Sequence, residues 1–388
     1  MSGARLRRLF SARGATQVAG GASAALVALE RSGPAPLVDR GSPDGALEIA
    51  VVIPSFRRGS GGHATIVNLL RALARGGHKP SLWLEDCEGR HRAERADVTR
   101  RSFTEFFAAG ELELHTDFEE WGGADVVLAT GWQTVARVML LDGAGARAYL
   151  VQDHEPDFYG ASAERLWAEA SYTHGAHCVA ASEWLAELLR SRYSASASHF
   201  DLGVEHSLYR ARDRARRSDL VVFYARAVTP RRAVPLGLAA LEELSRRRPD
   251  VEIALYGEAR GLHAPFAHTH LGVLAGERLA ELYSEATVGM VLSLTNPSLI
   301  GLEMMACGLP CVELASDSMR ETFGIDGPLA LTSADPLALC GAIEQLLDDE
   351  GRRSGIAAAG VELVSGRTWE HAAEQVEHAL AQALRARA

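Results

Sequence analysis

Two arginines follow the end of an apolar segment at a spacing that suits the binding of a diphosphate. The run 219–224 reads as a buried strand, Arg226 follows it, and Arg231 falls in the first turn of a helix expected over 230–246. A helix N-terminus offers free N–H groups and a positive dipole end, and guanidinium groups beside it can hold a diphosphate through paired hydrogen bonds. The alternative is that both arginines are surface charges at a solvated helix end.

A single carboxylate, Glu303, lies in the first turn of a short apolar helix expected over 302–307, after a strand over 288–293 and a polar loop. A carboxylate in this place can accept hydrogen bonds from the hydroxyls of a ribose. It could also serve only to complement the positive end of the helix dipole. Taken by itself, this helix favours the dipole interpretation.

Further candidates follow strands of the N-terminal half. The glycine-rich loop 57–63 opens a helix, where glycines let a ligand approach backbone N–H groups, but it lacks the order of a dinucleotide-binding fingerprint. Asp153 and His154 follow an expected strand over 148–151, and neighbours of this kind are more often structural. Trp132 follows another strand and could stack on an acceptor sugar, although a tryptophan is more often part of a core.

The elements that must position these residues alternate between strands and helices. Expected strands cover 47–53, 80–84, 125–129, 148–151, 177–181, 219–224, 251–256, 288–293 and 311–314. Expected helices cover 65–74, 133–141, 163–170, 183–190, 230–246, 276–286, 302–307, 336–347 and 369–384. This alternation predicts an α/β protein with two doubly wound parallel sheets, whose carboxyl ends face a deep common cleft.

The same pattern divides the chain. We expect an N-terminal arm over 1–46, a Rossmann-like acceptor domain over 47–208, and a Rossmann-like nucleotide-sugar domain over 209–366 that begins with a polar linker. A final helix over 367–388 is expected to pack back on the first domain. A length of 388 residues with 47% hydrophobic and 23% charged residues suits two globular domains.

Charge and cysteine content exclude several classes of function. The net charge of -10 argues against sequence-independent binding of nucleic acid. The five cysteines have no metal-ligand spacing, so we expect free, buried thiols in a reducing cytoplasm. Arginines at 5, 7, 8 and 13 make the start of the chain basic, but the run 14–29 is too short and too polar to span a bilayer. We therefore expect a basic arm with at most peripheral membrane contact.

Together, the two motifs resemble those of glycosyltransferase family 4, which has the GT-B fold of two facing Rossmann-like domains. That family carries an Arg, four residues and a Lys at the diphosphate, and two Glu residues separated by seven residues at the donor. Arg226 and Arg231 match the first motif with Arg in place of Lys, and Glu303 matches the second Glu. Thr295 stands in place of the first Glu. Segments 57–63, 130–134, 152–159 and 296–298 are similar to polyrhamnan-building rhamnosyltransferases that use dTDP-L-rhamnose.

The resemblance implies a set of site residues. It assigns catalytic roles to Arg226, Arg231, Asp153 and His154. It implies donor contacts at Gly61, Gly62, His63, Tyr224, Gly257, Thr295, Asn296, Ser298, Leu299, Ile300 and Glu303. Acceptor contacts are expected at Trp132 and Glu155.

A retaining transfer of a sugar to a glycan hydroxyl would follow, in which the leaving diphosphate oxygen helps to deprotonate the acceptor. Neither a cofactor nor a metal is expected, because the arginines supply positive charge and the chain has no Asp-x-Asp. The alternatives are a nucleotide-sugar epimerase or phosphorylase of the same fold, a non-catalytic nucleotide-sugar-binding partner and, more remotely, an NAD-dependent dehydrogenase. The oligomeric state stays open.

Overall fold

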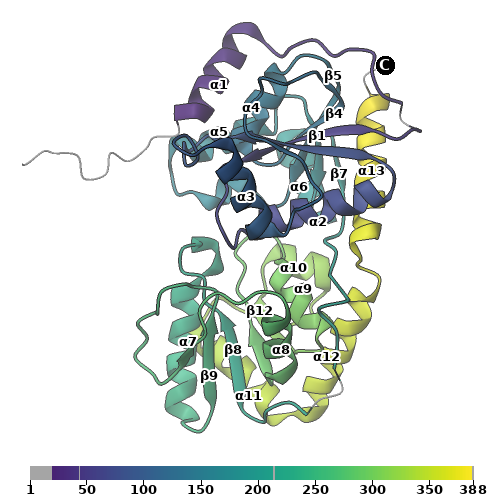
Figure 1. Cartoon of the computed structure of the whole chain (residues 1–388). Coiled ribbons are helices and arrows are strands. Elements are labelled where there is room, and N and C mark those ends of the chain that lie inside the picture. The colour runs from purple at the N-terminus through teal and green to yellow at the C-terminus, as the bar shows by residue number, and fades with distance from the viewer. Residues whose placement is uncertain (1–19, 43, 213–214, 387–388) are drawn as a thin grey trace, which may run out of the picture.

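The computed structural model describes residues 20–386, apart from residue 43 and residues 213–214. Two parallel sheets, each flanked by helices, form two domains that meet along one side (Figure 1). The prediction of two doubly wound α/β domains is confirmed. The five cysteines are free and buried, as expected.

The first sheet has the strand order β3-β2-β1-β4-β5-β6-β7. Its strands are β1 (Glu48–Pro54), β2 (Lys79–Glu85), β3 (Leu114–His115), β4 (Ala124–Ala129), β5 (Ala144–Val151), β6 (His177–Ala180) and β7 (Ala197–His199). The accompanying helices are α1 (Gly20–Ser32), α2 (Gly61–Arg75), α3 (Ala96–Phe107), α4 (Trp132–Leu140), the 3-10 helix η1 (Glu155–Phe158), α5 (Ala163–Ser171) and α6 (Glu183–Tyr193).

The second sheet has the order β10-β9-β8-β11-β12-β13. Its strands are β8 (Leu220–Tyr224), β9 (Glu252–Tyr256), β10 (Thr269–His270), β11 (Val288–Met290), β12 (Cys311–Leu314) and β13 (Ala330–Thr332). Its helices are the 3-10 helix η2 (Pro230–Arg232), α7 (Val234–Arg247), α8 (Glu277–Glu285), α9 (Leu299–Ala306), α10 (Asp317–Phe323), α11 (Pro336–Asp348) and α12 (Glu350–Ser365). The last helix, α13 (Trp369–Arg385), returns to the first domain.

The chain crosses between the domains twice, and the two crossings lie against each other. The N–H of Val204 donates to the carbonyl of Arg367 over 2.9 Å. A Cβ added to Gly203 would lie 2.6 Å from the nitrogen of Trp369, so the outgoing and returning segments are in direct backbone contact. After this point α13 runs along α2 on the first domain (Figure 1), where Val376 and Leu380 are fully buried.

Three local expectations are wrong. Part of the expected arm is the helix α1, because Ala25 and Leu29 are buried against the helical layer that contains α4. The helix expected over 230–246 is divided at Ala233, whose φ of 44° is left-handed, and α7 begins only after it. Glu303 lies in the second turn of α9, which begins at Leu299, so complementing the dipole at the first turn no longer explains it.

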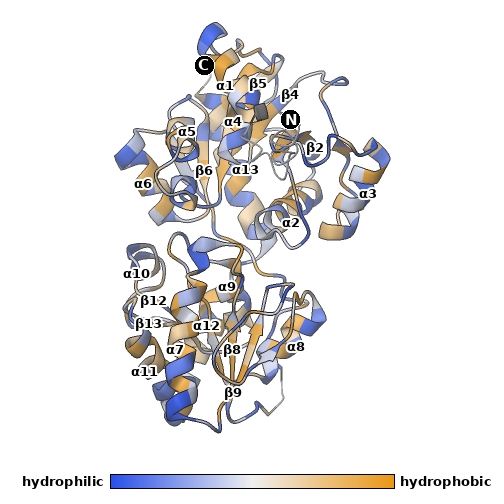
Figure 2. Cartoon of the chain, turned by 90° about the vertical axis from the view of Figure 1, so that its left-hand side faces the viewer, coloured by the Kyte–Doolittle hydropathy of each residue, from blue (hydrophilic) through white to orange (hydrophobic). Residues whose placement is uncertain are grey.

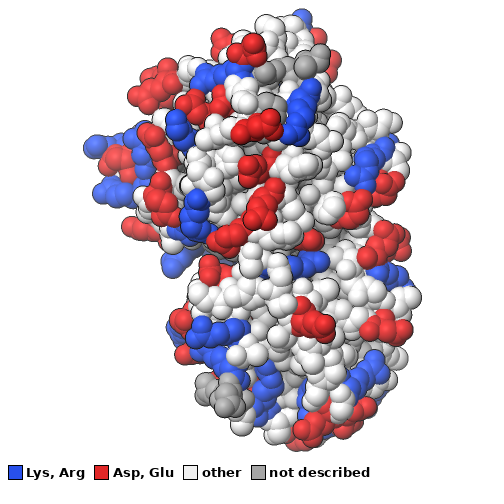
Figure 3. Space-filling view, turned by 90° about the vertical axis from the view of Figure 1, so that its right-hand side faces the viewer, with Lys and Arg blue, Asp and Glu red and all other residues white. Residues whose placement is uncertain are grey.

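Apolar residues gather on the strands and on the helix faces that cover them (Figure 2). The face in Figure 3 carries acidic and basic side chains intermixed. Within residues 20–386, no helix is both long enough and apolar enough to cross a bilayer. The arginines of the expected basic arm lie outside the described residues.

Candidate functional site

Arg226 and Arg231 lie at the carboxyl end of β8, where the two domains meet. Gly59, in the loop after β1, approaches Arg226 so closely that an added Cβ would lie 3.1 Å from Nη1. Arg231, in η2, forms an ion pair with Asp153 of the first domain, with 3.2 Å between Nε and Oδ2. Its guanidinium also lies over the ring of Phe158, 4.1 Å from the centroid. Both arginines therefore face the first domain from the second.

Arg232, the third arginine of the segment, faces the interior of the second domain instead. Its Nη1 donates to the hydroxyl of Ser293 over 2.7 Å, and burial lowers its pKa. Nearby Glu313 in β12 accepts the N–H groups of Ser293 and Leu314, both over 2.8 Å. Burial raises the pKa of Glu313 to about 8. Glu313 is not among the residues predicted for the site, although an acid inside the apolar run 311–314 is a signal for a buried polar network.

Glu303 is a buried carboxylate with an oxygen that no described residue contacts through a hydrogen bond. Its side chain lies near Tyr209, Tyr256 and Tyr283. Burial raises the pKa of Glu303 to about 8, and the Tyr209 hydroxyl lowers it in part. The atom Oε2 is buried without a hydrogen-bond partner among the described residues. An unsatisfied buried acceptor is costly, so this oxygen suits a ligand that donates a hydrogen bond.

The loop between β11 and α9 uses its polar residues mainly for structure. The side chain of Asn296 donates to the carbonyls of Gln152 and Ala181 and accepts from the hydroxyl of Ser182, over 2.8–3.2 Å. The expectation that Asn296 contacts the donor sugar is therefore not supported by this geometry. Ser298 caps α9 by accepting the N–H of Ile300, and Thr295 is buried. Leu299 and Ile300, the first residues of α9, are partly buried.

The start of α2 combines open glycines with a neutral histidine. A Cβ on Gly61 would meet no atom within 4 Å, and one on Gly62 would lie 3.5 Å from the Gln152 side chain. His63 is buried between the Ser60 hydroxyl, 2.8 Å from Nδ1, and the Pro54 carbonyl, 3.3 Å from Nε2. Burial lowers the pKa of His63 to about 4. Backbone N–H groups, rather than this ring, are what α2 can offer to a ligand.

His154 does not offer a free nitrogen to the site. Nδ1 faces Asp157 at 2.7 Å and Nε2 faces the hydroxyl of Tyr193 at 2.8 Å, and the side chain is buried. The ring therefore fixes η1 against α6. The expected catalytic contact of His154 with the donor is not supported by this arrangement, because both nitrogens already have protein partners.

Trp132 and Glu155 are both buried. The Trp132 indole donates to the Tyr159 hydroxyl over 3.0 Å, and only 3% of the residue is exposed. Glu155 accepts the N–H of Trp132 over 2.9 Å and the hydroxyl of Tyr149 over 2.5 Å. Burial raises the pKa of Glu155 to about 7. Both side chains are buried and already have protein partners, so this geometry does not support their expected roles at the acceptor.

Tyr224 and Gly257 pack against each other at the ends of β8 and β9. Gly257 has a φ of 96°, and a Cβ there would lie 2.5 Å from the Tyr224 ring. This close approach requires glycine. The contact between Tyr224 and Gly257 fixes the ends of β8 and β9, just before Arg226.

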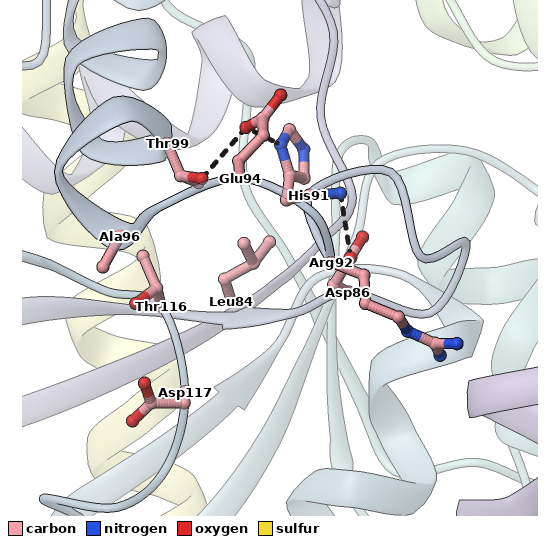
Figure 4. Close-up of a pocket in the computed structure, with 9 residues that line it drawn as sticks. All are labelled: Leu84, Asp86, His91, Arg92, Glu94, Ala96, Thr99, Thr116 and Asp117. Atoms are coloured by element: carbon pink, nitrogen blue, oxygen red, sulfur yellow. Dashed lines mark hydrogen bonds and ion pairs between the residues drawn. The ribbon is translucent and has the colours of Figure 1, made fainter.

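A separate pocket of about 390 Å³ opens at the carboxyl end of β2. Asp117 lies at one end of it and Glu94 at the other (Figure 4). His91, on its wall, stacks on Phe56 with 4.2 Å between ring centroids. Phe56 belongs to the loop in which Gly59 approaches Arg226. Among the described residues, no group of three His, Cys, Asp or Glu could hold a metal ion.

Family models match two segments of this chain. The model of the WsaF N-terminal domain matches residues 120–183, and that of the WsaF C-terminal domain matches residues 219–324. The O-antigen biosynthesis protein RfbC of Myxococcus xanthus is 31% identical over 260 residues, which cover 65% of this chain and 20% of RfbC. The D-inositol 3-phosphate glycosyltransferase of Stackebrandtia nassauensis is 31% identical over 166 residues, covering 42% of this chain and 37% of that enzyme. The chain thus spans well under half of these relatives.

Solved structures match a larger share of this chain than these relatives do. Sucrose-phosphate synthase from Thermosynechococcus elongatus has a TM-score of 0.66 at 18% identity, covering 87% of this chain and 99% of that one. Anabaena HepE in complex with UDP-glucose has a TM-score of 0.65 at 14% identity, covering 88% of this chain and 100% of that one. These likenesses show the fold, which is GT-B.

Proposed function

We propose that this chain is a retaining glycosyltransferase of polysaccharide biosynthesis that transfers L-rhamnose from dTDP-L-rhamnose to a glycan hydroxyl. The observation that carries the proposal is the buried, unpartnered Oε2 of Glu303, at the same edge of the second sheet as Arg226 and Arg231. A nucleoside diphosphate has the matching groups, a sugar hydroxyl that donates and a diphosphate that accepts.

The comparisons support the class of reaction. The matching domain models, the relative named for O-antigen biosynthesis and the relatives named as glycosyltransferases all favour sugar transfer. One similar structure contains UDP-glucose. The cytoplasm, where nucleotide sugars are available, is the proposed place of reaction, with at most peripheral contact with the membrane.

A dTDP donor matches the single unpartnered oxygen of Glu303. A 2′-deoxyribose offers one secondary hydroxyl, whereas a ribose offers two. One unpartnered oxygen, Oε2, is enough to accept the single hydroxyl. The choice of L-rhamnose rests on the resemblance to polyrhamnan-building enzymes.

In the proposed reaction, the acceptor hydroxyl attacks the anomeric carbon on the face that the diphosphate leaves. The leaving diphosphate oxygen takes the hydroxyl proton, so no separate protein base is needed. Arg226 and Arg231 stabilise the charge that grows on the diphosphate, an electrostatic role that other transferases give to a divalent metal.

The pocket of Figure 4 is the proposed place for the acceptor glycan, because the expected acceptor residues are buried. Asp117 and Thr116 can accept hydrogen bonds from neutral sugar hydroxyls, and Arg92 adds a donor group. Asp117→Ala is expected to raise the acceptor KM and to leave nucleotide affinity unchanged.

Nucleotide-dependent stabilisation tests the donor directly. The thermal midpoint should rise with dTDP more than with UDP or GDP, since a ligand at about 100 times its Kd adds about 2.7 kcal/mol. Arg226→Ala should abolish both this shift and the release of dTDP from dTDP-L-rhamnose. Arg246→Ala, an exposed arginine that pairs with Glu243 on α7, is the control. A protein that no nucleotide stabilises would rule out the transferase. Binding without turnover would instead favour a non-catalytic nucleotide-sugar-binding partner.

A further inference from the structure

One carboxylate, Asp153, joins the two domains at the arginine site. Its Oδ1 accepts the N–H of Asn296 from the second domain and the N–H of His154, both over 3.0 Å. Its Oδ2 faces Arg231 at 3.2 Å. Only 8% of Asp153 is exposed, so little water screens this charge. Asp153 thus presents anionic oxygen to the arginine that the proposed function assigns to the diphosphate.

The hold of Asp153 on Arg231 is electrostatic rather than directional. Although Nε of Arg231 lies 3.2 Å from Oδ2, the atom is buried without a hydrogen-bond partner among the described residues. The guanidinium rests on the Phe158 ring. Charge and ring contact therefore keep Arg231 in place while its Nε–H makes no hydrogen bond with the described residues. A phosphate oxygen that aligned with this donor would gain a hydrogen bond that Asp153 does not make.

Asn296 keeps the domains in register independently of Arg231. Its side-chain amide bonds Gln152, Ala181 and Ser182, which follow β5 and β6 of the first domain. Adding the backbone bond to Asp153, this single residue makes four hydrogen bonds across the domain boundary. Arg231 can therefore change its partner without releasing the boundary.

Asp153 keeps other partners if Arg231 leaves it. Glu155 lies near Asp153, which raises the pKa of Glu155 further, while Arg231 lowers it. Asp157 pairs with His154 and Arg165, not with Arg231. If Arg231 turned to another anion, Asp153 would still keep two N–H donors. Those bonds are enough to hold the carboxylate in place.

We infer that Asp153 is a positioning residue, which pairs with Arg231 in place of phosphate when no donor is bound. The donor diphosphate then replaces Asp153 as the partner of Arg231, while Asn296 keeps the domains aligned. This inference rests on the proposed function. Breaking the pair of Asp153 and Arg231 weakens the binding of both the donor and the product. Because dTDP must also displace Asp153, the exchange helps the product to leave.

The isosteric change Asp153→Asn tests this directly, since it keeps an oxygen for the N–H of Asn296 and removes the charge facing Arg231. Calorimetry should show dTDP binding tightened by about three- to tenfold, the range expected for a partly buried ion pair. The kcat and the KM for dTDP-L-rhamnose should both fall, because product release slows. A merely structural role would weaken binding instead.

Three further variants make the result specific. Asp157→Asn removes a neighbouring carboxylate charge, on η1, that does not pair with Arg231, and should leave dTDP affinity within about twofold. In an Arg231→Ala background, Asp153→Asn should have no effect, because the two act as a pair. Phe158→Leu weakens the hold on Arg231 with the carboxylate intact and should also tighten dTDP binding, which covers the case in which Asp153→Asn does not fold.

The outcomes separate the two ideas. If the unaltered chain does not bind dTDP, the proposed function fails, whether or not it binds UDP. If it binds dTDP but Asp153→Asn or Phe158→Leu binds it equally or less tightly, the exchange is wrong and the proposed function stands.

Discussion

At the scale of single residues, the site depends on polar atoms whose partners are incomplete. Glu303 is held inside the second domain with one oxygen unsatisfied, and the Arg231 Nε–H is buried without a hydrogen bond. Both atoms carry a desolvation cost in this structure. A ligand that satisfies both would recover that cost, so these residues couple stability to binding.

Glu303→Gln should change how stability depends on pH. Burial raises the pKa of Glu303 to about 8, above its ordinary value of 4.5. The stabilisation of the neutral carboxyl is complete below pH 4.5 and is lost as the pH rises through 8. The variant should therefore be more stable than the original at pH 9, by roughly 1–3 kcal/mol, and bind dTDP more weakly.

Denaturant unfolding at pH 5, 7 and 9 would measure this, with the exposed Glu362→Gln as the control. An unchanged pH profile would show that Glu303 is not the group responsible. Glu155 and Glu313 add to the same fall in stability, since burial also raises their pKa values.

Gly59→Ala should damage the site more than the fold. Gly59 has a φ of 76°, and an added methyl group would lie 3.1 Å from Arg226. The loop or the guanidinium must then move, and dTDP affinity should fall by about fivefold or more, roughly 1 kcal/mol. Gly33→Ala, with a φ of 68° and no atom within 4 Å, has the same backbone strain without the contact. Equal affinity in the two variants would contradict the role of this approach.

At the scale of elements, the sequence predicted strands better than helix starts. The expected strand 311–314 coincides with β12, because buried parallel strands are continuous apolar runs bounded by glycine or proline. The predicted start of α7 is wrong because two prolines, Pro230 and Pro235, can each stand in the first turn of a helix. Pro230 begins only a 3-10 turn, and the second residue of α7 is Pro235. Helices α3 and α12 were missed because both are rich in charged or small residues.

Gly237 shows what decides the placement of α7. A Cβ there would lie 2.2 Å from the Phe223 ring, so the helix backbone packs directly on β8. Gly237→Ala should cost about 2–4 kcal/mol despite the better helix propensity of alanine. Gly341→Ala in α11 meets no atom within 4 Å and should stabilise by about 0.5–1 kcal/mol. Urea unfolding of both would settle the point, and a neutral Gly237→Ala would show that α7 can move outward.

At the scale of the whole molecule, the sequence predicts that the two domains face each other, but not which side chains make the contacts between them. The sequence predicts Arg226, Arg231 and Glu303 at one edge of the second sheet, because the carboxyl ends of parallel strands lie at the same edge. It could not tell that Asn296 and His154 point at protein rather than ligand. The partners of Asn296 lie more than 110 residues away in sequence, and no local pattern encodes them.

Leu380→Ala should destabilise the first domain, although Leu380 comes after the second domain in the sequence. Leu380 is fully buried in α13, which packs on the first domain, and the truncation should cost about 2–5 kcal/mol. Hydrogen exchange should show lost protection in residues 47–208. Leu346→Ala, equally buried in α11, should instead affect residues 219–348. Matching exchange patterns for the two variants would mean that the domains unfold as one unit.

The position of α13 also sets an order of events during synthesis. A nascent chain emerges from the ribosome N-terminus first, yet the first domain lacks one layer of its core until α13 has followed. The second domain, complete by the end of α12, can fold earlier. The apolar face of α2 therefore stays uncovered until the residues of α13 have been translated, and a ribosome-bound chain stalled before Trp369 should be a target for chaperones that bind exposed apolar surface.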